Sequence, residues 1–149
     1  MCLDTIVKIA QIAAYTFGGL SLVITALAYR KSNKVKRGEW LKSLYEKFYE
    51  AEAFKSIRRE IEYDRLHSFL ALDEKEVPTN EESEEKLVDY LNFFEFIASL
   101  QNRQHIKKEE VEDLFNYYFQ KLHDSAFLRK YINGNGFENL AKVLNDFKQ

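Results

Sequence analysis

The sequence predicts an all-α protein: one N-terminal transmembrane helix followed by a five- or six-helix cytoplasmic domain. Residues 9–29 contain no charged side chain, and a helix of that length spans about 30 Å, the thickness of a bilayer's hydrocarbon core. The chain has one proline and five glycines, which favours helices joined by short turns. We therefore divide it into a transmembrane helix (1–30), a basic juxtamembrane linker (31–37) and a helical cytoplasmic domain (38–149).

The charges around the apolar segment predict its orientation. Five cations and no acid follow it in residues 30–37. By the positive-inside rule, residues 38–149 lie in the cytoplasm and the chain crosses the inner (cytoplasmic) membrane once. A cleaved signal peptide would carry its cations before the apolar stretch, and a buried core helix would be shorter.

One side of the predicted transmembrane helix carries small residues at helical spacing. They are Ala10, Ala14, Gly18, Ser21 and Thr25. Small side chains let helix backbones approach closely in lipid, so we expect this face to pack against another copy in a homo-oligomer. The alternative is that glycine and alanine are common in any membrane helix.

Helical patterns continue through the cytoplasmic domain. Apolar spacing predicts a helix from Gly38 to about Ile61 with a break near residues 50–53, then a short helical turn at His67. The acidic segment 73–85 is expected to be a surface loop, and Thr79 and Glu82 have the spacing of a capping box for the next helix.

The helix predicted for residues 81–101 is apolar nearly all round, with Phe93, Phe96 and Leu100 widening its core stripe. Asn92 and Glu95 lie within it, either as a buried polar contact between helices or as part of a ligand or catalytic site. Further patterns predict a helix over about 109–122, a short helix over 125–132, a break at the NGNG turn (133–136) and a last helix over 137–147.

The charge distribution excludes one class of partner. Residues 38–149 contain 16 cations and 23 acids, and seven of those acids lie in residues 73–85. Polymeric nucleic acid is not expected as a partner because the domain lacks a broad basic surface.

No arrangement typical of catalysis occurs in the sequence. The three histidines are far apart, and His105 with Glu109 offers only two ligands for a metal ion. There is no phosphate-binding glycine loop, and Cys2 is the only cysteine. We expect no enzymatic activity, no cofactor and no metal site.

Two basic clusters remain as candidates for binding a small anion. The first contains Arg58 and Arg59, with Arg65 and His67 nearby; the second contains Arg103, His105, Lys107 and Lys108 at the start of a predicted helix. Ordinary surface charge is the simpler explanation of each. In a homo-oligomer, however, such clusters could converge on a symmetry axis.

The string YLNFFEFIASLQNRQHIKKEEVEDLF, with Trp40 before it and the helix 137–147 after it, resembles an uncharacterised bacterial family. Its members are short proteins with an N-terminal membrane helix and a helical cytoplasmic domain of unknown function. The architecture is also similar to small CRISPR-associated membrane effectors, in which a helical cytosolic domain binds cyclic oligoadenylate. That similarity implies a role in anti-phage defence.

These observations lead to two functional expectations. The first is a non-enzymatic membrane sensor and effector whose oligomeric cytosolic domain binds an anionic signal, such as a cyclic nucleotide second messenger, and perturbs the membrane lipid. The alternative is a membrane-tethered helical adaptor that recruits a protein partner, with the acidic loop as its interaction surface.

Overall fold

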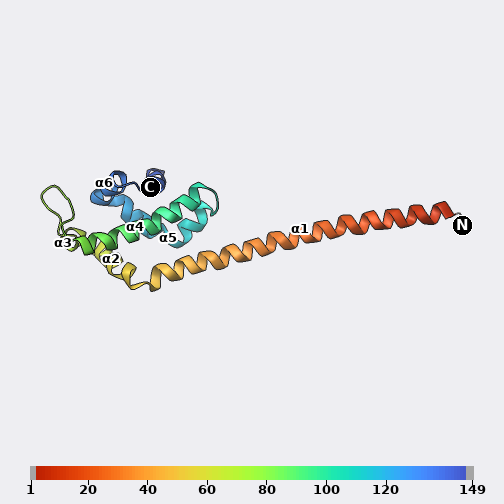
Figure 1. Cartoon of the computed structure of the whole chain (residues 1–149), viewed down its shortest axis with the longest axis horizontal. Coiled ribbons are helices and arrows are strands. Elements are labelled where there is room, and N and C mark those ends of the chain that lie inside the picture. The colour runs from red at the N-terminus through yellow and green to blue at the C-terminus, as the bar shows by residue number, and fades with distance from the viewer. Residues whose placement is uncertain (1–2, 147–149) are drawn as a thin grey trace. The chain divides into compact units, whose positions relative to one another are not determined.

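The computed structural model describes residues 3–146, with the side chains of residues 3–20, 22 and 23 left aside. Within these residues the chain forms seven helices and no strand, which confirms the all-α prediction (Figure 1). The helices are α1 (Leu3–Glu50), α2 (Glu52–Glu62), α3 (Leu66–Phe69), α4 (Glu81–Asn102), α5 (Lys108–Asp124), α6 (Ala126–Gly134) and α7 (Glu138–Asn145). Two compact units result, Met1–Glu46 and Lys47–Gln149.

Helix α1 continues through the segment that we described as a linker. Residues 31–37 are helical, and no new helix begins at Gly38. Lysine and arginine are good helix formers, and one glycine costs a helix only about 1 kcal/mol relative to alanine. The break predicted near residues 50–53 is confirmed, because α1 ends at Glu50 and α2 begins at Glu52.

The apolar segment falls mostly outside the residues whose side chains are described. Among the described residues, no helix combines the length and the apolar character needed to cross a bilayer. Ile24, Leu27 and Tyr29 are exposed.

Aromatic packing forms the core of the second unit. Phe48, in the last turn of α1, is fully buried, and its ring centroid lies 5.1 Å from Phe93 and 5.6 Å from Phe115. Helix α4 supplies the centre of this core, as predicted. Eight of its side chains are buried: Ser83, Leu87, Tyr90, Leu91, Phe93, Phe94, Ile97 and Ala98. The apolar face is narrower than predicted: Phe96 is 48% exposed because it lies opposite the buried stripe.

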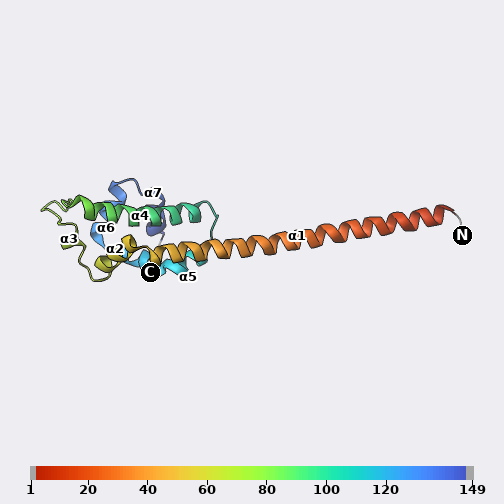
Figure 2. The same ribbon diagram turned by 60° about the horizontal axis from the view of Figure 1, so that its bottom comes forward.

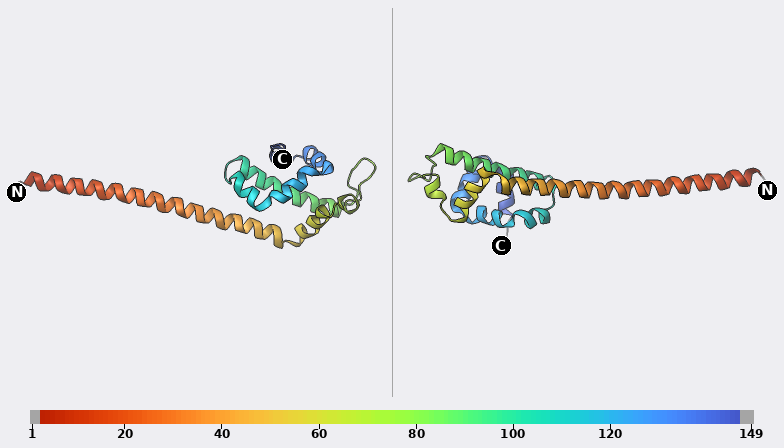
Figure 3. Two further views of the ribbon diagram at one scale, coloured as in Figure 1. Left: turned by 180° about the vertical axis from the view of Figure 1, so that it is seen from behind. Right: turned by 90° about the horizontal axis from the view of Figure 1, so that it is seen from below.

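Helices α2, α5 and α7 pack against α4. Helix α5 returns antiparallel to α4, so that Phe119 meets Phe94 edge-on (Figures 1 and 3). Helix α7 packs beside α4 (Figure 2). Ser125 caps the start of helix α6, because its hydroxyl accepts a hydrogen bond from the Leu128 amide at 3.3 Å.

Two predicted boundaries were displaced. Asn80, and not Thr79, caps α4, because its side-chain oxygen accepts a hydrogen bond from the Ser83 amide at 3.1 Å. Helix α6 also includes Asn133 and Gly134, so the NGNG break begins at Asn135. Gly136 then turns the chain with φ +84°, a conformation that glycine adopts without strain.

Candidate functional site

Arg58 packs against the aromatic core. Its guanidinium lies 4.8 Å from the ring centroid of Phe48 and 4.7 Å from that of Tyr49. Its Nη2 donates to the backbone carbonyl of Tyr49 at 3.1 Å, and its Nε donates to the carbonyl of Phe54 at 3.3 Å. The side chain therefore joins the end of α1 to α2 by cation–π and hydrogen-bond contacts.

The neighbouring arginines share one carboxylate. Arg65 contacts both oxygens of Glu60, with Nε 3.1 Å from Oε2 and Nη2 3.2 Å from Oε1. Arg59 lies 3.3 Å from the same Oε1. One of the three arginine charges of the first cluster is therefore compensated locally, by a carboxylate that Arg59 and Arg65 share.

The second cluster occupies the loop between α4 and α5. Arg103 ends α4, and His105 follows it; both side chains are exposed. Lys107 is the residue before α5, and its backbone N–H donates to the Glu110 carboxylate at 2.9 Å. Lys108 lies 3.4 Å from Glu112. Arg103, His105 and Lys107 thus form the exposed basic surface of this loop.

The two basic clusters lie apart from each other within one chain. Arg58 lies over Phe48, whose ring is 5.9 Å from that of Tyr90 on α4. Arg103 follows Tyr90 along α4 by a distance of about 20 Å. A single phosphate group therefore does not contact both clusters within one chain.

Glu95 has a structural role at the start of α7. Its Oε1 accepts hydrogen bonds from the backbone N–H and the side-chain amide of Asn139, at 3.1 and 2.7 Å. Its Oε2 accepts from the Leu140 backbone N–H at 2.7 Å. Asn102 donates to the Asn139 side chain at 3.2 Å. The carboxylate thus caps the N-terminus of α7 from another helix, whereas Asn92, its predicted neighbour, is exposed.

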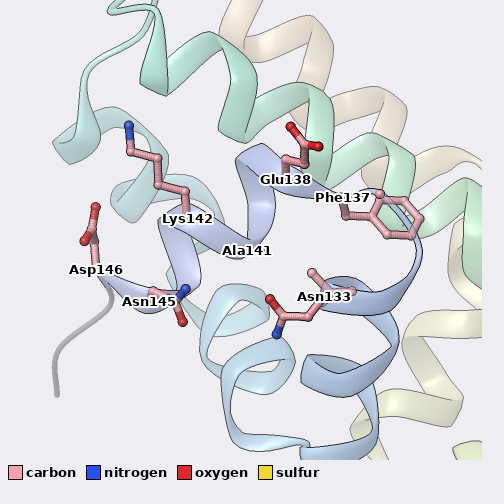
Figure 4. Close-up of a pocket in the computed structure, with 9 residues that line it drawn as sticks. Asn133, Phe137, Glu138, Ala141, Lys142, Asn145 and Asp146 are labelled. Atoms are coloured by element: carbon pink, nitrogen blue, oxygen red, sulfur yellow. The ribbon is translucent and has the colours of Figure 1, made fainter.

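A hollow of about 440 Å³ lies between α6 and α7 (Figure 4). Asn133 reaches it from α6, and Glu138, Lys142, Asn145 and Asp146 line it from the other side. The charged residues that line it are Glu138, Asp146 and Lys142, two acids and one cation, so the hollow does not favour a polyanion.

A second hollow, of about 320 Å³, lies beneath the acidic loop. It is lined by Lys75, Glu76, Val77, Pro78, Glu84, Phe127, Lys130, Tyr131, Gly134 and Asn135. Lys130 lies 2.8 Å from Glu76 of the loop, and the Tyr131 hydroxyl donates to Glu84 at 2.7 Å. Glu84 belongs to α4, so the prediction of a loop over 73–85 was wrong for residues 81–85, where the Asn80 cap starts the helix. The hydrogen bond from Lys130 lowers the pKa of Glu76. At its base, the Thr79 hydroxyl donates to the Ala71 carbonyl at 2.6 Å.

The other predicted residues stand as follows. The side chains of Ala10, Ala14 and Gly18 lie outside those described, whereas Ser21 and Thr25 are exposed on α1, with the Thr25 hydroxyl donating to the Ser21 carbonyl at 2.8 Å. Across the described residues, histidine, cysteine and acidic side chains form no group of three suited to a metal ion.

Sequence reasoning missed what Glu95 and Arg58 contact. Glu95 meets residues 44 and 45 positions later in the chain, and no local pattern marks that pairing. Arg58 had one usable signal, the aromatic residues at positions 48 and 49 at the end of α1 and at position 54 one turn earlier in α2. Comparison with family models, with curated proteins and with solved structures gives no significant match to this chain.

Proposed function

We propose that this chain is a non-enzymatic, membrane-anchored sensor and effector. Residues 9–29 anchor it in the inner membrane, its oligomeric helical domain binds an anionic signal in the cytoplasm, and the anchor helices rearrange in response. The observation that carries the proposal is the continuity of α1, which runs from Leu3 to Glu50 and ends with Phe48 in the aromatic core. A change in that core can therefore be passed along one helix toward the lipid.

The proposed anion site is the loop between α4 and α5, built from Arg103, His105 and Lys107. Within the second cluster, these three exposed side chains remain after Lys108, which lies 3.4 Å from Glu112. Because one chain presents them on an open surface, the site lies where the loops of several subunits meet. Convergent cations would bind a cyclic oligonucleotide through its phosphates.

The test uses the full chain in liposomes, titrated with cyclic oligoadenylates. We expect binding by calorimetry in detergent, an oligomer by light scattering and ligand-dependent release of a trapped dye. The double variant Arg103→Gln, Lys107→Gln should weaken binding by about tenfold or more, through loss of charge-assisted contacts. The control Lys42→Gln, Lys55→Gln removes the same charge from exposed positions elsewhere. A monomeric chain that binds none of these ligands would overturn the proposal.

The hollow beneath the acidic loop favours a second candidate, the membrane-tethered adaptor. Val77 and Pro78 lie beside Phe127 and Tyr131 in it, so an apolar side chain of a protein partner could enter while the acidic surroundings contact its basic residues.

Charge reversal tests the adaptor. Glu74, Glu81 and Glu85 are exposed, whereas Glu76, Glu82 and Glu84 contact Lys130, Lys86 and Tyr131. The triple variant Glu74→Lys, Glu81→Lys, Glu85→Lys should therefore preserve the loop and abolish proximity labelling of the partner. Unchanged labelling would exclude the acidic loop as the docking surface.

A further inference from the structure

One side of α1 changes from apolar to cationic within two helical turns. At about 100° per residue, five side chains fall within about 120° of the helix circumference. They are Ile24, Leu27, Arg30, Lys31 and Lys34, all exposed. Ile24 is 58% exposed and Leu27 is 59% exposed, so the apolar half of this face is open.

We propose that this face binds the headgroup of an anionic phospholipid. The inference rests on the proposed membrane anchoring and adds a ligand class and a binding surface to it. Acyl chains would pack on Ile24 and Leu27, while Arg30, Lys31 and Lys34 contact the phosphate of the headgroup, whose charge no ammonium group of the same lipid compensates. Leu27 and Lys34 are separated by about 10 Å along the axis, so one lipid can contact both.

Two features of the chain favour a lipid as the occupant of this face. The apolar side chains and the cations follow one another on the same side of the helix. A phospholipid has an apolar part and an anionic part and can contact both groups, whereas a free phosphate has no apolar part. No acid occurs between residues 9 and 38, so the segment contains no carboxylate to compensate these cations. The complementarity of charge therefore favours anionic over zwitterionic lipid.

Helicity through residues 31–37 makes the inference specific to one face. Lys36 is exposed and lies close to Lys34 in depth, but it projects from the opposite side of α1. Ser21 and Thr25 also lie on that opposite side, where the proposed helix–helix contact is. Lys34 and Lys36 thus form a matched pair with equal charge, equal residue type and opposite orientation.

The experiment reconstitutes the full chain in phosphatidylcholine bilayers with trace spin-labelled phosphatidylglycerol or phosphatidylcholine. Electron paramagnetic resonance then gives the ratio of the two lipids' association constants. For the unmodified chain at low salt we expect this ratio to favour phosphatidylglycerol by about threefold or more. Lys34→Gln should lower the ratio by about half or more, and Lys36→Gln should change it little. High salt should reduce the preference in the unmodified chain.

The outcomes separate the lipid site from the anchor. If the chain floats with phosphatidylcholine vesicles but shows no lipid preference, or if both variants lower it equally, the headgroup site is overturned and the anchoring stands. If the chain does not float with vesicles at all, both the site and the proposed anchoring fail.

Discussion

Two tyrosine hydroxyls show how one residue type can have opposite effects on stability. Tyr90 on α4 is fully buried, and none of the residues that the structure describes offers its hydroxyl a hydrogen-bond partner. Burial raises its pKa well above the usual value. Tyr131 on α6 is half-buried, and its hydroxyl donates to Glu84 at 2.7 Å. Burial, followed by this hydrogen bond, raises its pKa too.

Tyr90→Phe should stabilise the domain. The variant removes a buried polar group that gains nothing from the fold, so we expect the free energy of unfolding to rise by about 1 kcal/mol. Tyr131→Phe is the matched control, and it should lower the free energy of unfolding by about 1 kcal/mol because Glu84 loses a donor. Urea unfolding of the full chain in mild detergent, followed by circular dichroism, measures both. A loss of stability in Tyr90→Phe would mean that its hydroxyl has a partner in solution.

At the scale of elements, Glu95 joins α4 to the start of α7. Helix α7 has only eight residues, and such short helices depend on tertiary contacts. Glu95→Gln replaces one acceptor oxygen by an amide donor facing N–H groups, so we expect a loss of about 1–2 kcal/mol in unfolding free energy. Glu85→Gln, at an exposed position of the same helix, is the control and should change little. Equal effects of the two variants would contradict the capping role.

The sequence predicts the elements better than it predicts their contacts. The ends of α4 and the break between α1 and α2 follow from local signals: apolar spacing, the polar run before residue 81 and the loss of pattern after Glu50. The sequence pattern wrongly places Phe96 in the core stripe, because a helix with many aromatic residues shows little difference in polarity between its faces. The interactions of Arg58 and Glu95 depend on packing between separate helices, which one sequence does not encode locally.

At the scale of the whole molecule, the continuity of α1 allows a test of the proposed output. Proline at Asn33 would remove a backbone donor and clash with the preceding turn, at a cost of about 3 kcal/mol to the helix at that point. Asn33 is exposed on α1 and belongs to the unit Met1–Glu46. We therefore expect Asn33→Pro to leave the urea unfolding of the helical domain and the binding of the cyclic oligonucleotide unchanged, while ligand-dependent dye release from liposomes is lost.

Asn33→Ala is the control for this prediction, because it removes the same side chain and preserves the helix. It should release dye as the unmodified chain does. The comparison separates two ways in which a membrane effector can work. If α1 must be one helix for the signal to reach the lipid, only the proline variant fails. If Asn33→Pro releases dye normally, the helical domain acts without α1 as a rigid connection, and the proposal that α1 transmits the signal is wrong.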